Sequence, residues 1–369
     1  MPMNTSRRLT VVFGSLLLAG VTACEPKAAG DGASAAAGEC ASQEGAEYLC
    51  GINNAEKLTR VDGTRWAVAS ATGGGPTRIP PLYFVNLETR RIAGLDPASI
   101  KTDHDSKTFP GCDQPDFATM TSVGMDVRPL SGRNAFYVVN HGGRMTTEVF
   151  DIETTGDIPS LTWRGCIQPP DGKWFMDDLA ILPDGGIVIS NFFDPTDPAF
   201  KEKLSSGAPT GGLGVWRPGK GWTQMPIGQV SGPNGVTLSA DDRRVFFADY
   251  GGNGLARMEL ATGKIDQVKL GFLVDNLQLD EKGKYVLAGG QNAKVEDVFA
   301  CLESSTSVNC DIPFSVVAID PVTLAVTRIH GPAKLGVVGA GTGALQDGDF
   351  LWLTTFRSDR LPRIPYPLK

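Results

Sequence analysis

Hydrophobic residues in this chain gather in short runs of about five residues, and polar turns separate the runs. Six such runs are rich in β-branched and aromatic residues: Trp66–Ser70, Ala135–Val139, Gly186–Ser190, Val245–Asp249, Tyr285–Gly289 and Phe350–Thr354. Turns rich in Asp and Gly precede most of them, as in Leu182–Gly186 and Ser239–Asp242. Runs of this length beside such turns predict β-strands joined as hairpins.

A polar residue or a glycine stands ahead of each run, and these markers recur every 42 to 68 residues: Glu56, Gly124, Asp178, Asn234, Asn276 and Gly343. Each interval has the length of one four-stranded propeller blade. Glycine and proline, at 45 and 25 residues, leave few windows for long helices, and no helical period is sustained beyond the N-terminus. We therefore predict an all-β fold, a six-bladed β-propeller at residues 46–369.

The N-terminus is predicted to be a targeting segment. Arg7-Arg8 precedes the apolar stretch Leu9–Ala19, which is too short to cross a bilayer, and Val21–Cys24 resembles the lipobox of bacterial lipoproteins. We expect a signal peptide at residues 1–23 and lipidation of Cys24. An uncleaved membrane anchor with an incidental cysteine is the alternative.

The segment at 24–45 is rich in Ala, Gly and Ser, which predicts a flexible tether. The protein would then lie in the bacterial cell envelope, facing the periplasm or the cell surface and attached to a membrane through its lipid alone. A net charge of −7 without a basic run argues against nucleic acid as a partner and against attraction to anionic lipid.

Six cysteines remain after Cys24, an even number that suits disulfides in an oxidising compartment. No C-x-x-C pair suggests zinc. We expect Cys301 to pair with Cys310 across one loop, and Cys112 to pair with Cys166 and join neighbouring blades. Spacing alone does not fix these pairings.

Motifs of common hydrolases and nucleotide-binding proteins are absent from the sequence: G-x-S-x-G, H-E-x-x-H, a Walker motif and an EF-hand loop. Acidic and amide residues instead stand just before the predicted strands, in Asn54–Glu56, Asp177–Leu179, Pro233–Gly235 and Val274–Asn276, with Asn191 at a strand end. We interpret one set as oxygen ligands of a single hard cation on the propeller axis, most simply calcium: Glu56, Asn191, Asn234, Asp275 and Asn276.

Each of these residues also has a structural explanation. Asn234-Gly235 is a common turn dipeptide, and Asp275-Asn276 is suited to tying a strand end by side-chain hydrogen bonds. The residue types alone do not separate calcium from magnesium or zinc. The joint placement of the set at corresponding points of different repeats favours a metal site.

From about Cys50 onward the chain resembles the calcium-dependent lactonases and esterases of the paraoxonase (arylesterase), gluconolactonase and senescence marker protein superfamily. Short motifs carry the resemblance: Phe136–His141 with Thr147–Phe150, Asp178–Ile181 leading to Asn191 and Asp194-Pro195, Asn234–Ser239, and Leu273–Asn276. It implies a six-bladed propeller with a catalytic calcium bound by Glu56, Asn191, Asn234, Asp275 and Asn276. It also implies that His141 activates the hydrolytic water, with Asp275 as the alternative base.

Two positions depart from the paraoxonase pattern. Paraoxonases hold a second, structural calcium with acidic residues directly after the Glu and the first Asn, where this chain has Lys57 and Phe192. An ammonium group and an aromatic ring cannot serve as oxygen ligands, so we expect this ion to be absent or differently bound. The Lys57 ammonium is suited to part of the same space.

The sequence thus predicts a calcium-dependent hydrolase of small-molecule lactones or esters. The alternative is a lipid-anchored propeller without catalysis, similar to the strictosidine-synthase-like branch, that binds a small molecule or an envelope partner. Two carboxylates and three amides directed at one axis favour the hydrolase.

Overall fold

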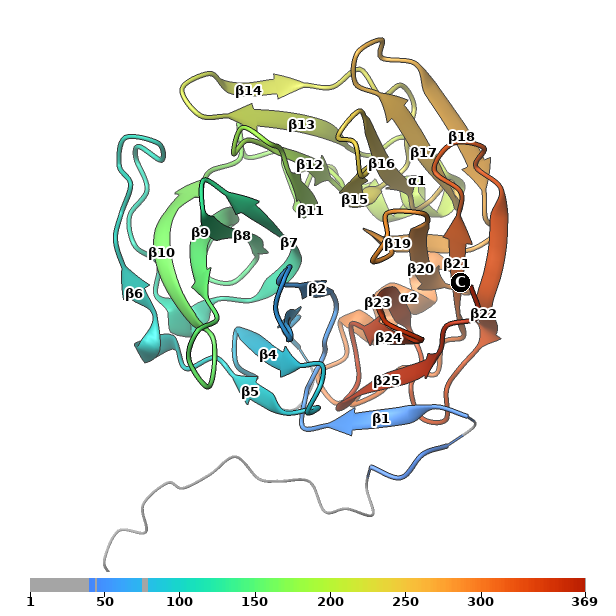
Figure 1. Ribbon diagram of the computed structural model, residues 1–369. Coiled ribbons are helices and arrows are strands. Elements are labelled where there is room, and N and C mark those ends of the chain that lie inside the picture. Colours follow the sequence, from blue (N-terminus) through green and yellow to red (C-terminus); the bar gives the residue numbers. More distant parts are fainter. Residues whose placement is uncertain (1–39, 44, 75–78, 369) are drawn as a thin grey trace, which may run out of the picture. The chain divides into compact units, whose positions relative to one another are not determined.

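A computed structural model describes residues 40–43, 45–74 and 79–368, which belong to one compact unit. Six sheets surround a common axis, as Figure 1 shows. This is the predicted six-bladed β-propeller, and each of the six predicted runs forms the second strand of its blade. The predicted signal peptide, the lipidation site Cys24 and most of the predicted tether lie outside the described residues.

In each of the first three blades, one strand lies at the axis and the others follow it outward. The first contains β2 (Leu58–Arg60), β3 (Trp66–Ser70), β4 (Leu82–Asn86) and β5 (Ile92–Gly94). The second contains β7 (Ser122–Leu130), β8 (Arg133–Asn140), β9 (Thr146–Glu153), β10 (Ser160–Ile167) and β6 (Lys101–Thr102), which pairs in parallel with β10. The third contains β11 (Met176–Ile181), β12 (Ile187–Asn191), β13 (Gly212–Arg217) and β14 (Gly221–Gln224).

The remaining blades follow the same order. The fourth contains β15 (Pro233–Leu238), β16 (Arg244–Asp249), β17 (Gly254–Glu259) and β18 (Ile265–Lys269). The fifth contains β19 (Leu273–Leu279), β20 (Val286–Gln291), β21 (Phe314–Ile319) and β22 (Val326–Ala333). The sixth contains β23 (Gly341–Asp347), β24 (Phe350–Thr355), β25 (Arg360–Pro365) and, as its outermost strand, β1 (Glu47–Cys50).

The two ends of the described chain meet in the last blade. β1 pairs with β25 in antiparallel register, so the N-terminal strand completes the C-terminal blade (Figure 1). The innermost strands contact one another in a closed ring that runs β2, β7, β11, β15, β19, β23 and back to β2. Residues at the start of each innermost strand therefore lie around one end of the axis.

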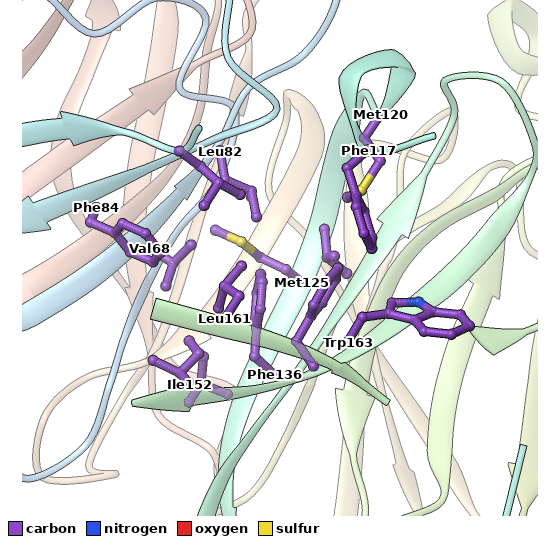
Figure 2. Packing of buried hydrophobic residues seen from close by; sticks show 14 of the residues in the cluster. Val68, Leu82, Phe84, Phe117, Met120, Met125, Phe136, Ile152, Leu161 and Trp163 are labelled. Atoms are coloured by element: carbon purple, nitrogen blue, oxygen red, sulfur yellow. The ribbon is translucent and has the colours of Figure 1, made fainter. Parts of the chain in front are cut away.

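Each blade is buried on both faces because it lies between two others. In β3, Val68 packs into a core shared with the second blade, whereas Ala67 and Ala69 pack into a core shared with the sixth. Figure 2 shows the first of these cores, where Val68 meets Met125 and Phe136. Alternate residues of one strand thus fill two cores, which explains why the strands read as continuous apolar runs.

Two short helices lie in the long connections between strands, α1 (Phe200–Ser206) and α2 (Val295–Leu302), with 3-10 turns η1 (Pro97–Ser99) and η2 (Phe117–Thr119) elsewhere. The strand pattern does not predict them, since seven or eight residues are too few to establish a helical period. α1 contacts α2, and both contribute to a cluster rich in aromatic residues. None of the described helices has the length and apolar composition that a membrane span requires.

The described part of the chain contains three disulfides: Cys40–Cys50, Cys112–Cys166 and Cys301–Cys310. Both predicted pairs are therefore confirmed. The expectation that Cys112–Cys166 joins neighbouring blades is wrong, because Cys112 lies between β6 and β7 and Cys166 lies on β10, all in the sheet of the second blade. The bond fastens a long connection to the edge of its own blade.

Candidate functional site

The innermost strands begin with a recurring irregularity. In β11, Met176 lies opposite Asn191 but Leu179 lies opposite Ile189, so β11 contains one residue more than its partner strand. The same excess occurs at the start of β7, β15, β19 and β23. A β-bulge of this kind breaks the alternation of side chains and re-aims them. In each of several blades, the side chains of two consecutive residues can therefore point toward the axis.

Glycine occupies the second bulge position in two of these strands, Gly124 in β7 and Gly235 in β15. A Cβ atom at Gly124 would collide with the backbone of Asp177 and Asp178, and one at Gly235 would collide with the backbone of Asp275. Glycine therefore permits the neighbouring strands to approach closely. This packing places the acidic residues of β11 and β19 near the axis.

Three carboxylates form the centre of the candidate site: Glu56 ahead of β2, Asp177 in β11 and Asp275 in β19. Burial raises the pKa of Glu56 to about 7, and the charge of Asp178 adds to this shift. Burial also raises the pKa of Asp177 and Asp275 well above the usual range, and the charge of Glu56 raises both further. The three groups therefore lie close enough to repel one another, which a bound cation would relieve.

Two amide oxygens beside these carboxylates are buried without a hydrogen bond from any described residue, Asn234 Oδ1 and Asn276 Oδ1. The other end of the Asn276 amide, Nδ2, donates to the carbonyl oxygen and to Oε1 of Glu56. Buried polar atoms without partners are uncommon and indicate a missing ligand or ion. The Asp177 carboxylate also accepts no hydrogen bond within the described part of the chain. All-oxygen donors of these types fit a hard cation such as calcium.

The site has further support around Asp275. Gln291 Nε2 donates to Asp275 Oδ2 at 2.7 Å and to the Gly341 carbonyl oxygen at 2.9 Å, and Tyr250 Oη donates to Gln291 Oε1 at 3.1 Å. Both partners are buried. Outer hydrogen bonds of this kind fix the orientation of a ligating carboxylate. Sequence reasoning missed Gln291 and Tyr250, which belong to no local motif.

Asn191 lies at the end of β12, the second strand of its blade, and its hydrogen bonds are structural. Its Oδ1 accepts the backbone N–H of Phe175 at 2.8 Å. In the same way, Asn140 at the end of β8 accepts the backbone N–H of Thr121. Asp249 at the end of β16 accepts the backbone N–H of Ser231. The structure thus gives Asn191 a repeated role in anchoring the entry to an innermost strand, while its predicted role as a metal ligand stays a prediction.

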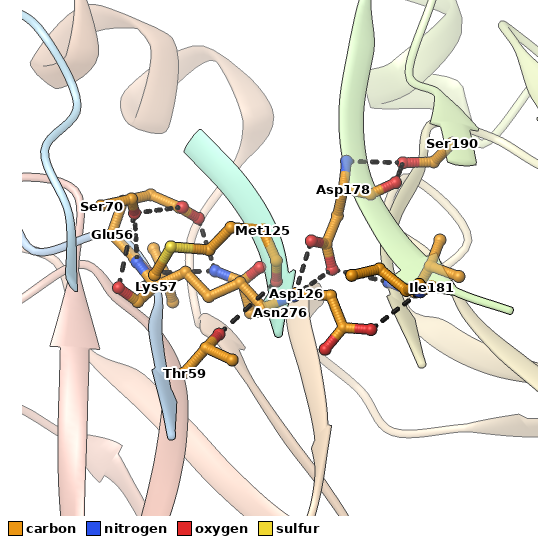
Figure 3. Close-up of polar contacts among 12 residues, drawn as sticks. Glu56, Lys57, Thr59, Ser70, Met125, Asp126, Asp178, Ile181, Ser190 and Asn276 are labelled. Carbon is orange, nitrogen blue, oxygen red and sulfur yellow. Dashed lines mark hydrogen bonds and ion pairs between the residues drawn. The ribbon is translucent and has the colours of Figure 1, made fainter. Parts of the chain in front are cut away.

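Lys57, the residue after Glu56, forms a buried ion pair with Asp178 (Figure 3). Lys57 Nζ lies 2.5 and 2.6 Å from the two carboxylate oxygens of Asp178, and Asp178 Oδ2 also accepts the backbone N–H of Val236 at 2.8 Å. Asp126 accepts the N–H of Ile181 at 2.8 Å, and burial raises its pKa to about 6. Lys57 therefore supplies the positive charge beside these buried carboxylates, while its predicted overlap with the place of the second calcium of paraoxonases stays a prediction.

His141 lies at the edge of the site, in the connection after β8. Its Nε2 is 2.7 Å from the carbonyl oxygen of Met176, the residue before Asp177, and its ring packs on Phe175. A carbonyl oxygen only accepts, so Nε2 carries the proton and Nδ1 remains an acceptor. Burial lowers the pKa of His141 to about 4, so the imidazole is neutral at pH 7.

Within the described residues, no three His, Cys, Asp or Glu side chains converge as a ready metal centre. Amide oxygens must therefore complete any such site. A cavity of about 790 Å³ does not contain the carboxylate cluster, because its lining comes from later positions of the innermost strands, among them Thr59, Asp126 and Gln278. The two arginines that line this cavity, Arg60 and Arg128, are already paired with acidic residues. The unpaired polar groups that could bind a metal or a substrate lie instead at the other end of the axis.

The sequence model of the SMP-30/gluconolactonase/LRE-like family matches residues 72–300, which is more than half of the chain. The chain belongs to this family. The gluconolactonase part of the predicted resemblance is thereby confirmed. No curated protein sequence matches the chain.

Solved structures show the family's fold. A gluconolactonase from Xanthomonas campestris aligns with a TM-score of 0.50 and 16% identity, covering 90% of this chain and 93% of that one. A putative gluconolactonase gives a TM-score of 0.51 and 16% identity, covering 90% of this chain and 96% of that one. At this identity the likeness concerns the fold alone, so the chemistry must be argued from the site.

Proposed function

We propose that this protein is a calcium-dependent hydrolase of lactones or esters. The observation that carries the proposal is that the charge of Glu56 raises the pKa of Asp177 and Asp275 at the starts of the innermost strands, where the amide oxygens of Asn234 and Asn276 are buried without a partner among the described residues. Membership in the SMP-30/gluconolactonase/LRE-like family supports a lactonase-type activity.

Glu56, Asn234, Asp275 and Asn276 would hold the ion, with Asp177 as a further ligand and Asn191 as the predicted fifth member of the set. Calcium bound there would polarise the carbonyl oxygen of the substrate as a Lewis acid. The Asn234 amide nitrogen would make a polar contact near the reacting carbonyl, whereas the Asn276 amide nitrogen already donates to two oxygens of Glu56 and holds that carboxylate in place.

A base is needed to accept the proton of the attacking water. His141 presents Nδ1 as a neutral acceptor, since Nε2–H is held by the Met176 carbonyl oxygen. Asp275 is the alternative, because only its Oδ2 receives a hydrogen bond, from Gln291, among the described residues. We retain both candidates.

The deciding experiment is hydrolysis of a panel of γ- and δ-lactones and aryl esters, followed by pH-stat. The purified protein is assayed with calcium, after chelation, and after calcium is restored. Activity that is lost on chelation and returns with calcium supports the proposal. No turnover in any condition, with the protein still folded, would leave the non-catalytic binding propeller as the better interpretation.

A further inference from the structure

Arg357 is a buried arginine without a counterion. It lies between β24 and β25, and its side chain has no solvent exposure. Only Nη2 has a partner, the Leu302 carbonyl oxygen at 2.6 Å, while Nε and Nη1 have none. No carboxylate of the described chain pairs with it. Burying a charge in this way is costly unless a partner of opposite charge arrives.

A second unpaired group belongs to the segment that packs against Arg357 at Gly74. Asn54 Nδ2 donates to the carbonyl oxygens of Thr72 and Gly74 at 3.0 and 3.3 Å, and Asn54 Oδ1 accepts the N–H of Ser358 at 3.3 Å. These bonds hold the segment after β3 against the residue that follows Arg357. The Thr72 hydroxyl oxygen in this segment is buried without a partner. Three donor groups, two nitrogens of Arg357 and one hydroxyl, therefore lack acceptors in one small region.

The backbone is shaped around the guanidinium. A Cβ atom at position 74 would lie 2.8 Å from Nη2 of Arg357, so glycine there leaves the room that the guanidinium occupies. Asn54 itself has a φ of 51°, a conformation that residues other than glycine seldom adopt. Strained backbone and unpaired donors at one place are typical of functional sites.

This region adjoins the candidate active site. Asn54 precedes Glu56 by two residues, which spans at most about 7 Å of extended chain. The carbonyl oxygen of Ala55 accepts the N–H of Thr355 at 2.9 Å, so the strand end that carries Arg357 is fastened beside Glu56. The donors thus lie at the same end of the propeller as the carboxylate cluster.

We propose that Arg357 and Thr72 bind a carboxylate group carried by the substrate, so that the preferred substrates are lactones or esters with an anionic substituent. This rests on the proposed function. Nη2 carries two N–H groups and donates one to the Leu302 carbonyl oxygen, so its second N–H, together with the unpaired N–H of Nε or of Nη1, matches a carboxylate in bidentate geometry, and the Thr72 hydroxyl is a further donor. A carboxylate neutralises the single charge of Arg357, whereas a phosphate dianion would place surplus negative charge near Glu56.

The test compares γ-butyrolactone with the same ring bearing a carboxylate, 5-oxotetrahydrofuran-2-carboxylate, using the full chain. In Arg357→Gln, the ratio of kcat/KM for the charged to the neutral lactone should fall by about 10-fold or more, the usual effect of losing a charge-assisted hydrogen bond. Arg357→Lys should retain part of the ratio. Arg243→Gln, which changes an exposed arginine at the opposite end of the innermost strands, should leave the ratio unchanged. An unchanged ratio in Arg357→Gln would overturn the proposal.

Binding gives a readout that does not depend on hydrolysis. Calorimetry with 2-hydroxyglutarate, the ring-opened form of the charged lactone, should show weaker binding to Arg357→Gln than to the wild type. Thr72→Val, which preserves the shape of the side chain, should weaken binding by a smaller factor and keeps the test open if Arg357→Gln does not fold. Binding without any lactone hydrolysis would overturn the proposed function and leave the carboxylate site standing. Absence of binding by the wild type would overturn the site.

Discussion

Lys57 and Asp178 form an ion pair on the axis, with Nζ lying 2.5 and 2.6 Å from the two carboxylate oxygens and both side chains buried. Asp178 also accepts the backbone N–H of Val236. The pair therefore joins the residue that precedes β2 to β11 and β15, so it links three of the six innermost strands. It supplies a positive charge where the acidic residues of several blades converge. This charge belongs to a side chain of the protein and not to a bound ion.

Lys57→Met should destabilise the fold by about 3 kcal/mol or more, because it leaves the Asp178 carboxylate buried and unpaired. The measurement is urea denaturation with a chelator present, which separates stability from metal binding. The control is Arg91→Met, since the Arg91–Asp157 pair is exposed and should contribute less than about 1 kcal/mol. The double variant Lys57→Met/Asp178→Asn should recover part of the loss. Equal effects of Lys57→Met and Arg91→Met would contradict this account.

Asp275→Ala and Asn234→Ala should lower both calcium affinity and hydrolysis, because each removes an oxygen that has no adequate substitute at the site. We expect calcium affinity, measured by calorimetry, to fall about 10-fold or more in each variant. Asn86→Ala is the matched control, since Asn86 caps an outer turn through its bonds to Glu88 and Thr89. Unchanged affinity and activity in both variants would refute the axial metal.

The same titration separates Asp177 from Asn191. Asp177→Asn should weaken calcium binding, because its carboxylate is unpaired and repelled by Glu56. If Asn191 only anchors Phe175, Asn191→Ala will lower stability and leave the affinity unchanged. A fall in affinity in Asn191→Ala would instead confirm that residue as a ligand.

The blades were predictable from the sequence because the second strand of each blade is buried on both faces. Strands such as Val245–Asp249 therefore stand out as apolar runs between turns, which local pattern reveals directly. The bulges were not predictable, because a single extra residue before Leu179 or Val236 does not disturb the local pattern. The alternation of residues along β11 therefore does not reveal that Asp177 lies beside Glu56 and Asp275 at the axis.

Contacts between segments that are distant in the chain could not be predicted from the sequence for a related reason. Lys57 and Asp178 are 121 residues apart in the chain, and Arg357 and Leu302 are 55 residues apart. Such pairs depend on how the blades close into a ring, which no local motif encodes. The sequence offers one indication of such contacts, which is the position of the residues in each repeat. Each innermost strand begins with a polar pair or a glycine at an equivalent place.

Cys24→Ser should move the protein from the membrane fraction to the soluble fraction of a bacterial host, or block its maturation. The physical reason is that a thioether-linked lipid is the only membrane attachment that the sequence predicts. Fractionation together with labelling by a radioactive fatty acid measures both effects. Ser34→Ala, which alters the predicted tether but keeps Cys24, should remain lipidated and membrane-bound. Unaltered anchoring of Cys24→Ser would rule out the lipobox interpretation.

His141 should make the stability of the fold depend on pH in a defined window. Its pKa is about 4 in the folded protein, against an ordinary value of 6.5, because it is buried. Between these values the unfolded chain binds a proton that the folded one does not, so stability falls as the pH falls from about 6.5 to 4. Urea denaturation at pH 7 and pH 4.5 should show that this loss is smaller in His141→Gln by about 1 to 3 kcal/mol. The same loss in both proteins, or an imidazole that titrates near pH 6.5 by NMR, would show that His141 is solvated and would weaken its assignment as the base.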